Sequence, residues 1–75
     1  MNLHEVERGK KVQITQIAKL DEMLRRRLSS FGIRVGSVVT VRQKCLFSGA
    51  YILECEGQQI GLRKKDIMAF EVKPL

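Results

Sequence analysis

The chain has 75 residues, with 14 Lys and Arg against 8 Asp and Glu, and a formal net charge of +6. This length allows one domain and leaves little room to enclose a cleft with converging polar groups, so a binding or adaptor role is favoured over an enzyme. No apolar run approaches the roughly 20 residues of a membrane span, and Met1 to Lys10 lacks the apolar centre of a signal peptide. We expect a single domain over residues 1–75, located in the cytoplasm.

The first residues predict a leading segment followed by a strand. Leu3 and Val6 are expected to anchor the amino end of the chain. Between Lys11 and Ala18, the apolar residues Val12 and Ile14 alternate with polar ones, which is typical of a strand with one buried face.

A helix is predicted after this strand, with its end at Gly32. The spacing of three and four residues along Leu20, Leu24, Leu28 and Phe31 places these side chains on one helix face. Gly32 suits the left-handed residue that follows a last helical turn. The next residue, Ile33, suits the apolar contact of a Schellman motif.

Charged residues also fit this helix. Asp21 and Glu22 stand at its expected start, where an aspartate caps free amides and acidic side chains favour the helix dipole. Three arginines, Arg25 to Arg27, lie nearer its end. Because consecutive helical residues point about 100° apart, these arginines are spread around the helix, and Arg27 falls beside the apolar face. A solvated face is favoured over a track for phosphates.

Short strands and turns fill the rest of the chain. Gly61 within one of the strands suggests a bend or a close approach of the backbone. Five strands with one inserted helix predict a mainly β fold, a small and partly open barrel. The predicted segments are a strand over Ser37–Gln43, a strand over Ala50–Glu56, a tight turn at Glu56 and Gly57, a strand over Gln58–Arg63, a helical turn over Lys64–Ala69, and a last strand with Phe70 and Val72 that ends at Pro74.

The loop from Lys44 to Gly49 carries two adjacent apolar residues, Leu46 and Phe47. Exposed apolar pairs often mark a contact site for a partner protein. The alternative is that one or both side chains fold back over the open end of the barrel. The sequence leaves both interpretations open.

Metal-binding and catalytic patterns are weak. Cys45, Cys55 and His4 have no recognised ligand spacing, and the two thiols are expected to be reduced and to act as small apolar residues. His4 with Glu5 and Glu7 does not supply the fixed geometry of an iron site. The chain also lacks a phosphate-binding glycine loop and a local signature of an activated nucleophile. We therefore predict no cofactor, no metal site and no enzymatic activity.

A set of glycines, aliphatic residues and basic residues lies along the chain at Arg27 and Leu28, Phe31 to Ile33, Gly36, Val39, Val41, Ile52, Gly57 and the run Leu62 to Asp66. In order and spacing, from about Leu3 to Val72, the chain resembles ferrous-iron transport protein A, the FeoA family. Many relatives carry proline where this chain has Val35 and Ala50, a departure that concerns the rigidity of loops more than the fold.

This resemblance implies an SH3-like barrel that acts as a cytoplasmic accessory of bacterial ferrous-iron uptake. Its implied partner is FeoB, the membrane transporter with a cytoplasmic GTP-binding domain, on which it would dock and which it would regulate. The same fold unit also forms the carboxy-terminal domain of metal-dependent repressors.

On the adaptor hypothesis, Leu46 and Phe47 provide apolar anchoring, while Arg27, Arg63 and Lys64 steer the encounter with an acidic surface. The alternative is a basic small barrel that binds nucleic acid, or a repressor-type regulatory module. Four aromatic residues, of which at least two are expected to be buried, are few for a platform on which bases stack.

Overall fold

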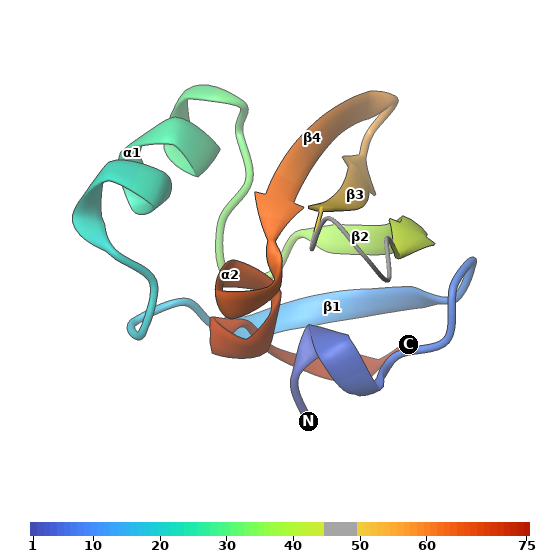
Figure 1. Ribbon diagram of the computed structural model, residues 1–75. Coiled ribbons are helices and arrows are strands. Elements are labelled where there is room, and N and C mark those ends of the chain that lie inside the picture. The colour runs from blue at the N-terminus through green and yellow to red at the C-terminus, as the bar shows by residue number, and fades with distance from the viewer. Residues whose placement is uncertain (45–49) are drawn as a thin grey trace.

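The structure is a computed structural model that describes residues 1–44 and 50–75. The strands form one five-stranded sheet in the order β4-β3-β2-β1-β5, with antiparallel neighbours throughout (Figure 1). The fold is therefore mainly β with a helix after the first strand, as the sequence predicts, and it is a small SH3-like fold. In chain order the elements are the 3-10 turn η1 (Leu3–Glu5), β1 (Lys11–Gln16), α1 (Glu22–Ser30), β2 (Val38–Lys44), β3 (Ala50–Cys55), β4 (Gln58–Arg63), α2 (Lys64–Ala69) and β5 (Glu71–Pro74).

Two irregularities interrupt the register of the sheet. The pairing of β1 with β5 shifts between Ile14 and Gln16, and the pairing of β2 with β3 shifts between Val41 and Gln43. Bulges of this kind bend a strand and increase its twist. They favour a curved sheet, whose two outer strands, β4 and β5, are joined through α2 (Figure 1).

The core is built from alternate strand residues together with side chains from η1, α1 and α2. Thr40 is also buried, although the alternation of β2 predicts that it faces water. The reason is that β2 lies inside the sheet, where Thr40 stands between Lys11 of β1 and Glu54 of β3. The buried apolar residues are Leu3, Val6, Val12, Ile14, Leu20, Leu24, Leu28, Ile33, Val39, Val41, Tyr51, Leu53, Cys55, Ile60, Leu62, Ile67, Phe70 and Val72.

The end of α1 confirms the predicted Schellman motif. Gly32 has a φ of +78°, and its N–H donates to the carbonyl oxygen of Ser29 at 2.9 Å. The N–H of Ile33 donates to the carbonyl oxygen of Leu28 at 2.9 Å, and both of these side chains are buried. The prediction for Phe31 is wrong, since its side chain is 40% exposed. Phe31 is the C-cap, and the turn at Gly32 brings Ile33 to the core instead.

Replacement of Gly32 by alanine is expected to lower the free energy of unfolding by about 1–2 kcal/mol, the cost of a left-handed conformation for a residue with a Cβ. No atom lies within 4 Å of a Cβ added at this position, so the cost comes from the backbone alone. Urea unfolding measures it. The control is Gly61→Ala, which also meets open space but has no positive φ. An equal loss in both variants would contradict this explanation.

Candidate docking groove

An open groove of about 800 Å³ separates α1 from the outer strand β4. One wall is formed by the amino-terminal half of α1, and the other by β4 and the start of α2. The lining residues are Asp21, Glu22, Met23, Leu24 and Arg27 on the helix side, Ala50 on β3, Gly61, Leu62 and Arg63 on β4, and Lys65 and Asp66 on α2.

The groove owes its shape to α1 and to a glycine. Leu24 and Leu28 bury one face of α1 in the core, which fixes the helix beside the sheet, while Met23 on the neighbouring face is 83% exposed. Across the groove, Gly61 is exposed, and a Cβ at this position would meet no atom within 4 Å. The wall formed by β4 is therefore bare backbone at Gly61, next to the apolar side chains of Leu62 and Leu24.

Arg63 connects the two walls at the end of the groove near α2. Its backbone N–H and its Nε each donate to Oδ2 of Asp66 at 3.1 Å. Its Nη2 also lies 3.7 Å from Oδ2 of Asp21. The other carboxylate oxygen of Asp21, Oδ1, caps α1 by accepting a hydrogen bond from the N–H of Leu24 at 2.8 Å. Asp66 is buried and Arg63 is exposed. Arg63 thus belongs to a network with two carboxylates that ties the start of α1 to the start of α2.

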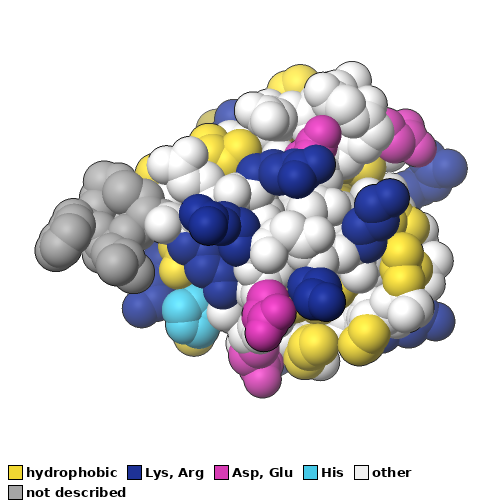
Figure 2. Space-filling view, turned by 90° about the vertical axis from the view of Figure 1, so that its right-hand side faces the viewer, with side chains coloured by type: hydrophobic (Ala, Val, Ile, Leu, Met, Phe, Trp, Pro, Cys, Tyr) yellow, Lys and Arg dark blue, Asp and Glu magenta, His cyan; other side chains and the backbone are white. Residues whose placement is uncertain are grey.

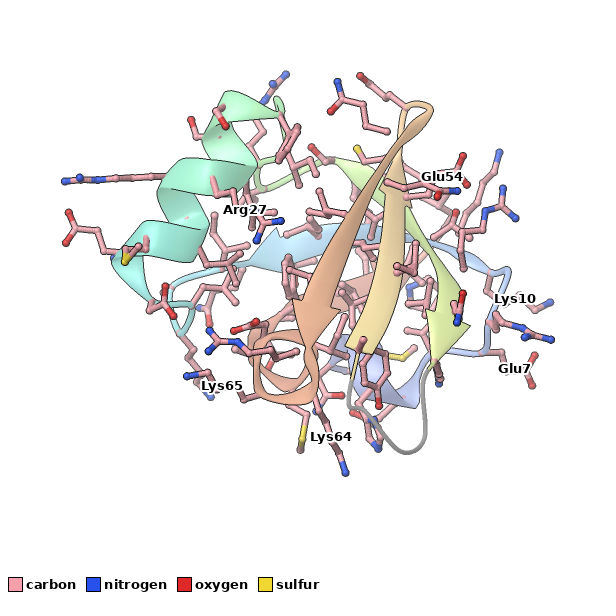
Figure 3. All side chains as sticks on the ribbon, turned by 45° about the horizontal axis from the view of Figure 1, so that its top comes forward. Glu7, Lys10, Arg27, Glu54, Lys64 and Lys65 are labelled. Atoms are coloured by element: carbon pink, nitrogen blue, oxygen red, sulfur yellow. The ribbon has the colours of Figure 1, made fainter. Side chains whose placement is uncertain are left out.

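Arg27 and Lys65 are the cations of the groove that form no ion pair within residues 1–44 and 50–75. Arg27 extends from α1 toward β4, and Lys65 projects from α2 at the other end of the groove (Figure 3). Lys64 is exposed but does not line the groove. Leu46 and Phe47 lie outside the described residues. Of the predicted contact residues, Arg27 and Arg63 therefore line the groove.

Sequence analysis missed the contributions of Met23, Gly61 and Lys65 to this site. Gly61 gave a signal, because a glycine within a strand marks a place where another backbone can approach closely. Met23 gave a weaker one, as an apolar residue off the buried face of a predicted helix.

On one face of the molecule, basic residues do not gather into a single track. Figure 2 shows Lys and Arg side chains in separate groups, with Asp and Glu side chains and polar surface between them. Two of the arginines have acidic partners: Arg26 pairs with Glu22 one helical turn away, and Arg42 pairs with Glu54 across β2 and β3.

Among the residues considered as metal ligands, Cys45 lies outside the described residues, whereas His4 contacts Tyr51. The hydroxyl of Tyr51 lies 3.3 Å from Nδ1 of His4, and the ring of one residue meets the edge of the other. Burial raises the pKa of the Cys55 thiol, and the negative charge of Glu56 adds to the effect. In the described parts of the chain, no three His, Cys, Asp or Glu side chains gather closely enough to hold a metal ion. Likewise, no helix found there combines the length and apolar character needed to cross a membrane.

Comparison with solved structures places the fold in a defined class. The FeoA protein from Chlorobium tepidum superposes with a TM-score of 0.90 at 23% identity, over 100% of this chain and 70% of that protein. A FeoA-like protein from Clostridium acetobutylicum gives a TM-score of 0.78 at 27% identity, over 100% of this chain and 86% of that one. A manganese-dependent transcriptional repressor gives 0.85 at 21% identity, with 100% of this chain covering 41% of the repressor.

These likenesses and the curved antiparallel sheet define a small SH3-like β domain, which matches 70% of the FeoA protein and 41% of the repressor. The FeoA domain family matches residues 1–74, nearly the whole sequence. The chain therefore belongs to the FeoA domain family. A search of curated protein sequences finds no match.

Proposed function

We propose that this chain is an accessory protein of bacterial ferrous-iron uptake that docks on a FeoB-type membrane transporter and regulates it, without enzymatic activity of its own. The observation that carries the proposal is the FeoA family match over residues 1–74, which supports a role in ferrous-iron transport. A net charge of +6 favours association with an acidic surface.

The groove between α1 and β4 supports a binding role in particular. It combines an exposed apolar side chain, Met23, with the cations Arg27 and Lys65, and apolar anchors with charged neighbours are typical of protein interfaces. Such a surface is open on one side and suits a partner's backbone or side chains better than an enclosed small molecule.

Capture of the FeoB-type transporter from solubilised membranes tests this function. The tagged chain is expected to retain the transporter at about 0.1 M salt and to lose most of it near 1 M, where the Debye length falls from about 10 Å to about 3 Å. A Leu46→Asp/Phe47→Asp variant tests the predicted apolar anchor and should retain less. If the parent chain captures no transporter at either salt concentration, the proposal is wrong.

A repressor-type module is the second candidate, favoured by the likeness to the manganese-dependent repressor. In that protein the matching unit makes up 41% of a longer chain. Recovery of nucleic acid in place of the transporter, eluted by high salt, would favour a role in nucleic-acid regulation.

A further inference from the structure

The outer edge of β4 has unpaired backbone groups. Glu56 and Gly57 form a two-residue turn with φ values of 51° and 84°, the positive pair that a type I′ hairpin requires. Such a turn is flanked by a hydrogen-bonded pair, here Cys55 with Gln58. Because hydrogen-bonded and non-hydrogen-bonded pairs alternate along an antiparallel ladder, the N–H and C=O groups of Gln59 and Gly61 point away from β3.

The contacts of Arg63 agree with this alternation. Arg63 lies two residues after Gly61, so its backbone groups also point away from β3. Its N–H accordingly donates to Asp66 and not to β3. Gln59 and Gly61 are both exposed, and their outward backbone groups have no hydrogen-bond partner among the described residues. Two residues of β4 thus offer four backbone groups along the side of the molecule that borders the groove.

We propose that an extended acidic segment of the partner protein pairs with the outer edge of β4 and becomes a sixth strand of the sheet. Strand addition supplies affinity through main-chain hydrogen bonds, while neighbouring pockets supply specificity. The residue of the added strand that lies opposite Ile60 has its side chain on the same face of the sheet as Leu62. Leu24 adds apolar surface there, so we expect this residue to be apolar.

The positive charge of the groove favours an acidic segment as the added strand. Arg27 and Lys65 line the groove without an ion pair in the described part of the chain, whereas Arg63 is already held by Asp21 and Asp66. Acidic side chains in the added segment are attracted to Arg27 and Lys65, which line the groove. A second copy of this chain fits less well, because its net charge of +6 opposes the approach of a like-charged molecule.

The proposal rests on the proposed function only for the identity of the partner protein. Charge-reversal variants test it with the cytoplasmic part of the transporter as the probe. Arg27→Glu/Lys65→Glu is expected to weaken binding at least tenfold. The matched control, Arg25→Glu/Lys73→Glu, makes the same change in net charge at exposed residues outside the groove and should change binding less than twofold. Equal weakening by both pairs overturns the proposal.

Gly61→Pro tests strand pairing directly. Proline removes an N–H that forms no bond with β3, so the hairpin keeps its ladder while the edge loses a donor. Binding is expected to fall at least tenfold, with the amide spectrum of the rest of the protein retained. If this variant does not fold, amide hydrogen exchange of the parent chain decides: the Gln59 and Gly61 amides should exchange at least tenfold more slowly with the partner bound. Unchanged exchange at both amides overturns the proposal.

Failure of this inference is distinct from failure of the proposed function. If the transporter binds but Gln59 and Gly61 keep their free exchange rates, docking stands and strand addition is wrong. If the transporter does not bind, a synthetic peptide, acetyl-Thr-Glu-Val-Glu-Thr-amide, serves as the probe in an amide-shift titration. Shifts of the Gln59 and Gly61 amide signals support binding of the peptide at the groove if they vanish when lysine replaces both glutamates of the peptide. If these shifts are absent at millimolar peptide concentrations, the proposal of strand addition is wrong.

Discussion

Replacing Phe70 by alanine is expected to lower the free energy of unfolding by about 3–5 kcal/mol. Phe70 is fully buried between α2 and β5, and it is among the largest side chains of the core. Removing the ring forfeits its burial and leaves a cavity that the surrounding chains fill only partly. A chain of this size has a core that supplies about 3–5 kcal/mol in all, so the variant should be largely unfolded at 25 °C.

Circular dichroism with urea unfolding measures this loss. The matched control is Met68→Ala in α2, two residues before Phe70. Met68 is 48% exposed, so this substitution should change the free energy of unfolding by less than about 1 kcal/mol. A Phe70→Ala protein with an unfolding midpoint close to that of the parent would show that Phe70 is not an essential part of the core.

Asp66→Ala is expected to destabilise the protein by about 1–3 kcal/mol. Asp66 is only 6% exposed and accepts hydrogen bonds from the backbone N–H and the guanidinium of Arg63. Alanine leaves these donors to water and removes the side chain that covers the start of α2. Because α2 carries the fully buried Ile67, the loss should extend beyond one local bond.

Asp66→Asn provides the comparison for this variant. Asparagine keeps an acceptor for the N–H of Arg63 but loses the charge. The free energy of unfolding of Asp66→Asn should therefore lie between those of the parent and Asp66→Ala. The surface pair of Arg26 and Glu22 gives a second control. Both side chains are well exposed, and Glu22→Ala should cost no more than about 1 kcal/mol in the same urea experiment. Equal losses for Asp66→Ala and Glu22→Ala would contradict the importance of burial.

Much of the fold could be predicted because local sequence and tertiary packing agree. Val12 and Ile14 mark β1 by alternation, and Gly32 with Ile33 marks the end of α1, since the left-handed turn and the buried side chain require these residue types. Phe31 is exposed although the helical spacing places it on the buried face, and Thr40 is buried although it alternates with Val39 and Val41. Their exposure depends on where the chain goes next and on which strands flank β2, and neither is visible in a local pattern.

The site was predicted less well than the fold. Arg27 and Arg63 were chosen for their charge, and the structure places both at one groove. Sequence charge alone does not distinguish Arg63, which two carboxylates hold, from Arg27, which has no ion pair among the described residues. It also does not reveal that Gly61 lies on an outer strand, because strand order depends on pairing between distant segments.

The two outer strands of the sheet differ in a way that bears on self-assembly. At β5, the N–H of Val72 donates to the carbonyl oxygen of Met1 at 2.8 Å, Asn2 bridges to Glu71, and Pro74 has no N–H to offer. Among the described residues β4 has no such cover. A sheet with one bare edge can join another sheet once only, so edge pairing between copies ends at a dimer and does not propagate into a fibre. Light scattering from concentrated protein should therefore show no particle larger than a dimer.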